Sequence, residues 1–288
     1  MIHLTPEVQN LIDQALAEDQ TFSDPTTHSL IPHNLKGVGL VRAKSVGVLA
    51  GVDVSLAVFR RVDPRLCGEA LMEDGASLVP GDSIARVEGS AASILRAERP
   101  ALNFLQRMSG IATDTARYVK AVEGLKSKIV DTRKTVPGLR YLDKYAVRAG
   151  GGANHRMNLA DGILIKDNHI AALRSRGLNL KETVLLALER ASHTVKVEVE
   201  VTNLEELGEA LEAGAHIIML DNMSLDTMRQ GVEMVNGRAI LEASGGINLE
   251  TARAVAETGV DLISIGGLTH SVKALDISLD LEFNQEVG

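Results

Sequence analysis

The feature that most constrains the fold is a repeat of strand-like and helix-like segments in the second half of the chain. Apolar segments begin near residues 195, 216, 238 and 261, at intervals of 21, 22 and 23 residues. Amphipathic segments stand between them, with Asn203 and Asn248 at expected N-cap positions and Gly214 and Gly259 at expected helix ends. Such a period is typical of βα units, which build parallel sheets.

Two further apolar segments, near residues 128 and 162, bring the number of expected strands to six. Parallel βα units wind right-handed, so they form a barrel or an open doubly wound sheet. Six strands are fewer than a complete eight-stranded barrel requires. We therefore predict an α/β fold whose larger domain, residues 109–270, is an open or incomplete parallel α/β barrel.

The first hundred residues follow a different pattern. Thr5 and Pro6 are typical of a helix start, and short β-like segments with turn residues follow them. A long helix is expected from "ERPALNFLQRMSGIAT", with Pro100 in its first turn. This mixture predicts an N-terminal α+β sandwich domain over residues 1–108, to which the C-terminal tail 271–288 returns as a helix and a strand.

Composition narrows the class of protein. Hydrophobic residues make up 45% of the chain but aromatic residues only 2%, which suits parallel strands covered by helices. The net charge of −8 argues against a general nucleic-acid binder. No apolar run approaches the roughly 18 residues of a membrane span, and the acidic N-terminus is unlike a signal peptide. Since the single Cys67 favours a reducing compartment, we expect a soluble, cytoplasmic protein.

Charged residues or glycine-rich turns stand at the ends of all six expected strands. In chain order they are Arg133-Lys134, Lys166, Glu200, Asp221, Ser244-Gly245-Gly246 and Gly266-Gly267. In a βα barrel the carboxyl ends of the strands converge on one mouth, where the chemistry takes place. Several cations, two carboxylates and glycine-rich turns at such a mouth predict a site for a small, multiply charged anion.

Each of these signals has a simpler interpretation when it is taken alone. Arg133 and Lys134 could form a solvated turn, and Lys166 could extend along an apolar surface to water. Glu200, in the alternating segment "VKVEVEV", could lie on the wet face of an ordinary strand, and Asp221 could cap the next turn. The predicted site therefore depends on the strand ends coming together.

Three loop segments add to this picture. "EASGGI" and "SIGGLTHS" follow the last two strands, where barrels commonly bind phosphate through backbone N–H groups. "AGGGANHR" (149–156) is either a flexible connector or a segment that brings His155 and Arg156 to the mouth. The histidines and the lone cysteine lack the spacing of a zinc site, and no Walker loop occurs.

Taken together, the motifs "DTRKT", "GGGANHRMNL", "ILIKDNH", "VEVEV", "LDN", "EASGGI" and "GGLTHS" resemble those of the quinolinate phosphoribosyltransferase family. The resemblance begins at "ERPALNFLQRMSGIAT" and is looser over the first ninety residues. It implies an N-terminal α/β sandwich on an open α/β barrel. It also implies a reaction of quinolinate with phosphoribosyl pyrophosphate and Mg²⁺, giving nicotinate mononucleotide, pyrophosphate and CO₂ in NAD synthesis.

The resemblance also implies roles for individual residues. The two carboxylates of quinolinate would be surrounded by Thr132, Arg133, Lys134, His155, Arg156 and Lys166. Glu200 and Asp221 would hold the ribose and its Mg²⁺, and together with Lys134 and Lys166 they are the expected catalytic groups. The 5′-phosphate would lie against Ser244, Gly245, Gly246, Ile265, Gly266 and Gly267.

Members of the family are dimers, so the resemblance implies a homodimer in which Arg99 reaches the partner's pocket; a higher oligomer remains open. Taken alone, Arg99 is a solvated residue near a helix start. Two other functions also remain open. Lys166 could form a Schiff base, as in an aldolase, if its amine is neutral. A related protein that only binds a nucleotide or an oxyanion would release no CO₂.

Overall fold

The computed structural model describes residues 2–283, and the chain divides into two compact units. The first comprises the chain up to Ala116, residues 135–151 and the chain from Leu268 onward; the second comprises Arg117–Lys134 and Gly152–Gly267. The predicted division at residues 108 and 270 differs from this one. It placed residues 135–151 in the larger domain, whereas in the structure they group with the first unit.

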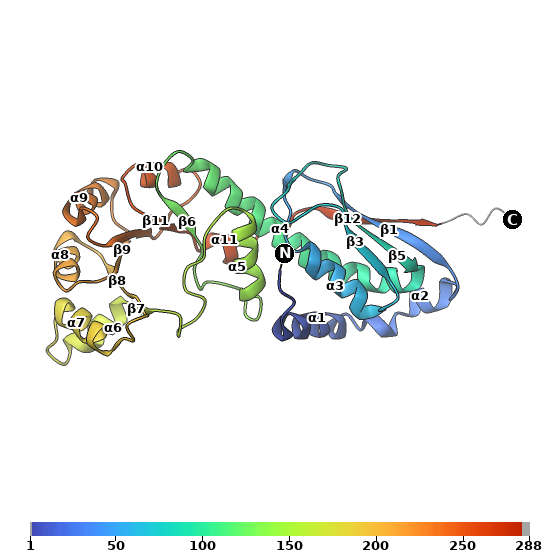
Figure 1. Cartoon of the computed structure of the whole chain (residues 1–288), viewed down its shortest axis with the longest axis horizontal. Helices are drawn as coiled ribbons and strands as arrows, with labels where there is room; N and C mark the ends of the chain where they lie inside the picture. Colours follow the sequence, from blue (N-terminus) through green and yellow to red (C-terminus); the bar gives the residue numbers. More distant parts are fainter. Residues whose placement is uncertain (1, 284–288) are drawn as a thin grey trace. The chain divides into compact units, whose positions relative to one another are not determined.

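A four-stranded antiparallel sheet in the order β12-β1-β5-β3 forms the centre of the first unit (Figure 1). Its edge strand β12 pairs with β1 from Gly37↔Phe283 to Ala43↔Ile277, so the tail of the chain completes this sheet. Residues 284–288 of the predicted tail lie outside the described part. The strands of this unit are β1 (Lys36–Ala43), β2 (Gly47–Val48), β3 (Cys67–Ala70), β4 (Ser77–Leu78), β5 (Ser83–Ser90) and β12 (Ile277–Phe283).

The helices of the first unit begin where the sequence supplies capping and apolar residues. Thr5 accepts a hydrogen bond from the Val8 N–H at 3.4 Å, and Pro6 opens α1, which buries Val8, Ile12 and Leu16. The helical elements are α1 (Pro6–Glu18), η1 (Thr21–Ser23), α2 (Pro25–Leu30), α3 (Val52–Val62), α4 (Ala91–Ala121), α5 (Arg140–Ala149) and α11 (Gly267–His270).

The predicted start of the long helix was wrong. Helix α4 begins at Ala91, so Pro100 lies inside the helix and not in its first turn. The reason is the apolar spacing ahead of the proline: Ala91, Ile94 and Ala97 are buried and continue one helical face. Pro100 removes one backbone donor but does not end the helix.

Six parallel strands form the sheet of the second unit, in the order β6-β11-β10-β9-β8-β7. The predicted open or incomplete parallel α/β barrel is confirmed as a six-stranded parallel sheet with edge strands β6 and β7, and the separate N-terminal unit has an antiparallel sheet. The elements are β6 (Lys128–Val130), β7 (Ile163–Ile165), α6 (Asp167–Arg174), α7 (Leu180–Arg190), β8 (Val197–Val201), α8 (Leu204–Glu212), β9 (Ile217–Asp221), α9 (Leu225–Val235), β10 (Ile240–Ser244), α10 (Ala252–Ala256) and β11 (Leu262–Ser264).

Local signals position these helices. The Asn203 side chain accepts a hydrogen bond from the Glu206 N–H at 2.9 Å and caps α8, and Gly214 follows that helix with φ = 84°. Asn248 instead accepts bonds from Glu250 N and Thr251 N in a turn, and α10 begins only at Ala252. Helices α8 and α9 lie outside β8 and β9 (Figure 1).

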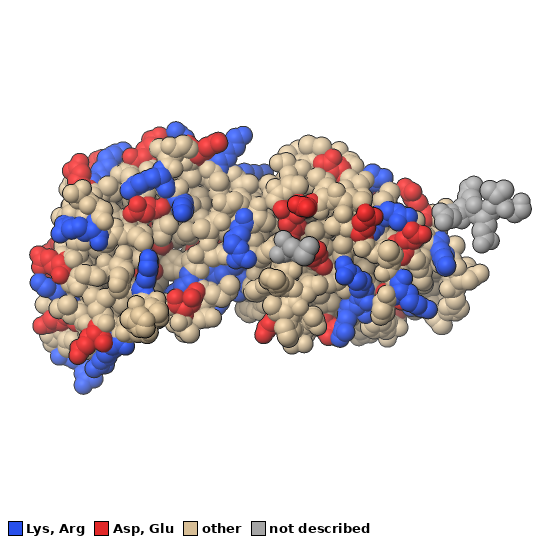
Figure 2. Space-filling model, viewed as in Figure 1, with Lys and Arg blue, Asp and Glu red and all other residues tan. Residues whose placement is uncertain are grey.

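The surface carries charges of both signs. On the face drawn in Figure 2, lysine and arginine side chains are interspersed with acidic ones. Within the described residues, no helix is long and apolar enough to cross a membrane.

Gly150, the first glycine of "GGG", is a packing residue at the C-terminal end of α5. A Cβ at this position would overlap with the backbone oxygen of Ala112 and lie 2.8 Å from Thr115 Cβ, both in α4. The absence of a side chain is what allows these atoms to approach. Gly208 in α8 differs, since a Cβ there would meet nothing within 4 Å.

We expect Gly150→Ala to destabilise the fold and Gly208→Ala to stabilise it. Overpacking at Gly150 should lower the free energy of unfolding by about 1–3 kcal/mol. Alanine in place of Gly208, inside a helix, should raise it by up to about 1 kcal/mol. Urea unfolding followed by circular dichroism measures both values, and equal effects of the two substitutions would contradict this account of Gly150.

Candidate active site

A cavity of about 340 Å³ lies at the carboxyl ends of the parallel strands, within the second unit. All six strands, or the segments that directly follow them, contribute to its wall. The lining residues are Thr132, Arg133, Lys134, His155, Arg156, Leu164, Lys166, Glu200, Met219, Asp221, Glu242, Ser244 and Ser264. The structure thus brings together the predicted cations and both predicted carboxylates.

The motif "DTRKT" supplies two of the four cations in the cavity. Arg133 and Lys134 follow β6, and Thr132 Oγ1 accepts a hydrogen bond from the Lys134 N–H at 3.0 Å, which fixes the turn. The Nε of Arg133 is buried and has no hydrogen-bond partner among the described residues. A buried guanidinium donor without a partner favours an anionic ligand at this point of the wall.

Arg156 is the third cation, and its environment is strongly polar. Its Nη1 donates to the Gly162 carbonyl oxygen at 2.9 Å. Burial, and then the positive charge of Arg133, lower the pKa of Arg156, whereas Glu198 opposes this shift. Two guanidinium groups that repel each other in one wall are stabilised by a ligand with more than one negative charge.

Lys166 is the fourth cation. Its Nζ lies 3.2 Å from Glu200 Oε2, and its side chain is 46% exposed. The alternative of a Schiff-base lysine requires a neutral amine. A half-exposed ammonium paired with a carboxylate gives no support to that alternative.

The segment "AGGGANHR" is held in place at its C-terminal end. Ala153 forms a parallel β-bridge with Val130 beside β6. Asp131, which is fully buried, accepts hydrogen bonds from Asn154 Nδ2 at 2.6 Å and from the His155 N–H at 2.9 Å. These contacts bring His155 and Arg156 to the cavity, so this part of the segment is not a flexible connector.

Glu200 is the penultimate residue of β8 and Asp221 is the last residue of the adjacent strand β9, and both are half-buried in the cavity wall. Glu200 pairs with Lys166, and Asp221 accepts a hydrogen bond from Asn222 Nδ2 at 2.8 Å. Val199 and Val201, the neighbours of Glu200 in β8, are buried on the other face of that strand. Two carboxylates on neighbouring strands are the hard oxygen ligands that Mg²⁺ prefers.

The two predicted glycine turns follow the neighbouring strands β10 and β11. Gly245 and Gly246 have φ of 94° and 62°, and a Cβ at Gly245 would overlap with the side chain of Asn222. A Cβ at Gly246 or Gly267 would meet nothing within 4 Å, so their backbone is open to a ligand. Ser244 and Ser264 line the cavity, whereas Gly245, Gly246, Ile265, Gly266 and Gly267 lie just beyond these strand ends.

Arg99 lies apart from this set in the chain. It is an exposed residue of α4, in the first unit, and it does not line the cavity. Its predicted role in a partner's site stays a prediction.

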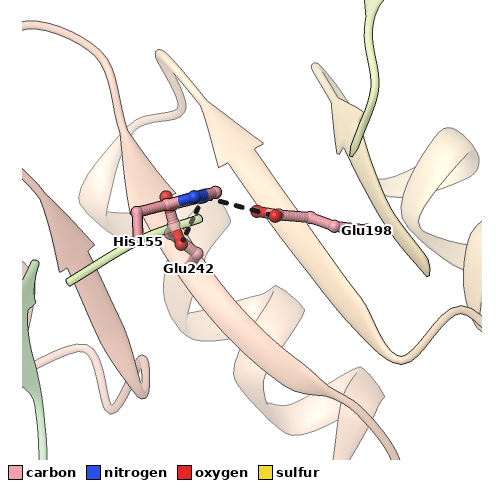
Figure 3. A group of neighbouring side chains, drawn as sticks. All are labelled: His155, Glu198 and Glu242. Carbon is pink, nitrogen blue, oxygen red and sulfur yellow. Dashed lines mark ion pairs between the residues drawn. The ribbon is translucent and has the colours of Figure 1, made fainter. Parts of the chain in front are cut away.

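A buried acidic cluster was missed by the sequence reasoning. His155 Nε2 lies 3.3 Å from Glu198 Oε2 and 3.6 Å from Glu242 Oε2 (Figure 3). The side chains of Glu198 and Glu242 are 6% and 1% exposed. Burial, and then the charge of Glu198, raise the pKa of Glu242 to about 7. The sequence held two signals of these acids: Glu198 lies on the same face of "VKVEVEV" as Glu200, and one acid, Glu242, interrupts the apolar segment "RAILEAS".

Comparisons with known proteins agree with the geometry. Residues 24–109 match the sequence model described as "Quinolinate phosphoribosyl transferase, N-terminal domain", and residues 111–280 match that of the C-terminal domain. The chain belongs to the quinolinate phosphoribosyltransferase family. The resemblance stated from the motifs is thereby confirmed.

Relatives in this family match over nearly their whole length. The chain is 44% identical over 286 residues to a probable nicotinate-nucleotide pyrophosphorylase [carboxylating] of Bacillus subtilis, covering 99% of this chain and 96% of the relative. It is 44% identical over 279 residues to the nicotinate-nucleotide pyrophosphorylase [carboxylating] of Mycobacterium leprae, covering 95% and 96%. The crystal structure of NadC from Streptococcus pyogenes aligns with a TM-score of 0.93 at 41% identity, covering 99% and 100%.

The raised pKa of Glu242 makes a prediction about stability. A carboxyl group whose pKa is higher in the folded state than its ordinary value of 4.5 stabilises the fold below pH 4.5, and this contribution is lost as pH rises through about 7. Glu242→Gln cannot ionise, so it should gain stability relative to the native protein over that range. The gain should be on the order of 3 kcal/mol, at 1.36 kcal/mol per pKa unit.

Unfolding free energies measured from pH 4.5 to pH 8 test this difference. Glu250→Gln, a substitution at an exposed residue of the same unit, is the matched control and should parallel the native protein. A Glu242→Gln curve that also parallels the native protein would show that Glu242 titrates normally.

Proposed function

We propose that this chain is a nicotinate-nucleotide pyrophosphorylase of the carboxylating type. It transfers phosphoribosyl from phosphoribosyl pyrophosphate to quinolinate and releases nicotinate mononucleotide, pyrophosphate and CO₂, in NAD biosynthesis. The observation that carries the proposal is the single cavity in which four cations face two carboxylates beside two glycine turns. The names of the relatives at 44% identity point to the same reaction.

The cations account for binding of a dicarboxylate. Arg133, Lys134, Arg156 and Lys166 place four positive charges around one cavity, with Thr132 and His155 in the same wall. Arginine forms paired hydrogen bonds with carboxylates, and it fixes their orientation as well as their charge. Catalysis then consists largely of holding the ring nitrogen of quinolinate against the anomeric carbon of the sugar.

Glu200 and Asp221 account for the sugar side of the reaction. Breaking the bond to pyrophosphate leaves positive charge on the ribose, and two carboxylates at the cavity wall stabilise it. The same carboxylates fit Mg²⁺, and no third acid or histidine forms a metal-ligating group with them in the described residues. Mg²⁺ held partly by substrate oxygens and water would neutralise the charge of the leaving pyrophosphate.

Decarboxylation follows from the first step. Once the ring nitrogen carries the ribose, the ring is cationic. The bond between the ring carbon and the adjacent carboxylate breaks, CO₂ leaves, and the electron pair stays on the ring carbon until it takes up a proton. The open backbone after β10 and β11, at Ser244–Gly246 and Ile265–Gly267, is the proposed seat of the 5′-phosphate.

Arg133→Ala tests the dicarboxylate pocket. It removes a charged donor whose Nε is buried without a partner, so the KM for quinolinate should rise about 10- to 100-fold, the equivalent of about 1.5–3 kcal/mol. Turnover should also fall, because the ring is less well oriented. The assay is Mg²⁺-dependent release of CO₂ from carboxyl-labelled quinolinate with phosphoribosyl pyrophosphate.

Arg229→Ala is the matched control for this experiment. Arg229 lies on α9 and forms an exposed pair with Asp226 at 2.7 Å. Its substitution should leave both constants unchanged. If Arg133→Ala has unaltered kinetics and circular dichroism shows an intact fold, Arg133 does not bind the dicarboxylate.

We further propose that the protein is a cytoplasmic homodimer in which Arg99 completes the partner's site. Arg99→Ala and Glu200→Gln should each be nearly inactive alone. After subunit exchange, mixed dimers contain one site with neither substitution, so the mixture should recover about a quarter of the native activity. Recovery of no activity in a mixture that has exchanged subunits would show that Arg99 and Glu200 serve the same subunit.

A further inference from the structure

Glu198 and Glu242, which form a cluster with His155, have no role in the reaction steps above. The three side chains come from the segment after α5, from β8 and from β10, and they point toward one another (Figure 3). His155 and Glu242 also line the cavity, and we call this part of its wall the floor. Both acids are buried, and each has one carboxyl oxygen, Oε1, without a hydrogen-bond partner among the described residues. Two acids buried beneath a site for a dianion need an explanation, because like charges at short range repel.

The backbone fixes the state of the histidine. His155 Nδ1 accepts a hydrogen bond from the Arg156 N–H at 2.7 Å, so this nitrogen carries a lone pair. In a neutral imidazole the hydrogen then resides on Nε2, the atom that faces both acids. One N–H satisfies one carboxylate, and Glu198 Oε2 is the nearer acceptor at 3.3 Å. Glu242, at 3.6 Å, has the Ser264 hydroxyl as a donor, but its Oε1 has no partner in the described residues.

A bound metal ion does not explain why the two acids are buried together beside His155. The ligand atoms of the three residues lie within 4.8 Å of one another, close enough to hold a transition metal. However, a metal bound to Nε2 requires the lone pair there and a hydrogen on Nδ1. That hydrogen would point at the N–H of Arg156. The backbone therefore favours a proton at Nε2 over a metal ion.

The other groups around Glu242 reinforce the argument. Glu198 on β8 and Asp131 after β6 are acidic and raise the pKa of Glu242, whereas His155 and a hydrogen bond from Ser264 on β11 oppose this shift without outweighing burial. Met219 and Leu262, its register partners on β9 and β11, are apolar. The cations Arg133, Arg156 and Lys166 line the cavity, where Arg156 interacts with Glu198 and Lys166 with Glu200. Apart from His155, no basic side chain is paired with Glu242 in the described residues.

We propose that Glu242 is a positioning residue that is kept protonated, so that the floor of the cavity presents one negative charge to the dicarboxylate in place of two. Ionisation of Glu242 weakens binding of the dianion, and binding of the dianion draws a proton onto Glu242. The raised pKa of this group has the direction that this role requires. The inference rests on the proposed function for the identity of the dicarboxylate.

The first test measures KM and kcat for quinolinate from pH 6 to pH 9 in the native protein, Glu242→Gln and a control, Glu257→Gln. Glutamine has the shape of a protonated acid and cannot ionise. In the native protein and the control, KM should rise above about pH 7, approaching tenfold per pH unit. In Glu242→Gln, KM at pH 6.5 should stay near the native value and should not rise. Glu257 is an exposed residue that pairs with Arg253 outside the cavity.

Two kinetic outcomes would overturn the proposal. One is a Glu242→Gln variant whose KM at pH 6.5 exceeds the native value by more than about tenfold, or about 1.4 kcal/mol, because the ionised acid would then be the form that is needed. The other is a variant that keeps the native rise of KM with pH. A general loss of fold would lower the fraction of active protein and kcat, but it would not flatten the dependence of KM on pH.

The second test needs no turnover. Calorimetric titration with quinolinate near pH 7.5, in two buffers of different ionisation enthalpy, counts the protons taken up on binding. The native protein should take up a proton that Glu242→Gln does not. Proton uptake without any CO₂ release would support the inference while refuting the proposed function. CO₂ release with equal proton uptake in both proteins would refute the inference alone. Tight binding of Zn²⁺ that His155→Ala abolishes would also overturn it.

Discussion

Repulsion among the four cations of the cavity is the constraint on which the rest of the site depends. Arg133, Lys134 and Lys166 meet because parallel strands end at one edge, and Asp131 brings the loop with Arg156 to the same cavity. Each added cation makes the next more costly unless acids lie nearby. Glu200 pairs with Lys166, and Glu198 offsets part of the repulsion between Arg156 and Arg133. These acids allow the cationic wall to form, but they also oppose the dianion that the wall is built to bind.

A proton on Glu242 relieves this conflict. Glu198 is the nearer acceptor for the Nε2–H of His155 and interacts with Arg156, whereas a charge on Glu242 would only repel the substrate. Asp131 has a different task. It is fully buried, and it accepts hydrogen bonds from the Asn154 side chain and the His155 N–H. Asp131 therefore positions the loop that carries His155 and Arg156. The three buried acids of the second unit thus have different roles: Asp131 positions the loop, Glu198 interacts with His155 and Arg156, and Glu242 holds a proton.

The sequence predicted the strand ends well because periodicity and parallel winding determine which edge they share. Arg133, Lys166, Glu200 and Asp221 each ended a strand-like segment, and the structure places all four on one cavity. Reading along the chain could not find Glu242, because one acid in an apolar strand does not reveal which face it occupies. It also could not assign "AGGGANHR", whose order comes from the bridge of Ala153 to Val130 and from Asp131, more than twenty residues earlier.

The two faces of β8 have different roles, since one packs into the core and the other carries acidic side chains. Val197, Val199 and Val201 are buried on one face, while Glu198 and Glu200 point to the other. Burying an acid with one oxygen left without a hydrogen-bond partner costs free energy that apolar packing must offset, so a strand selected only for stability would not carry Glu198, nor β10 Glu242. Their burial beneath the cations is therefore evidence of function in its own right, since only a charged ligand above them makes their protonation state matter.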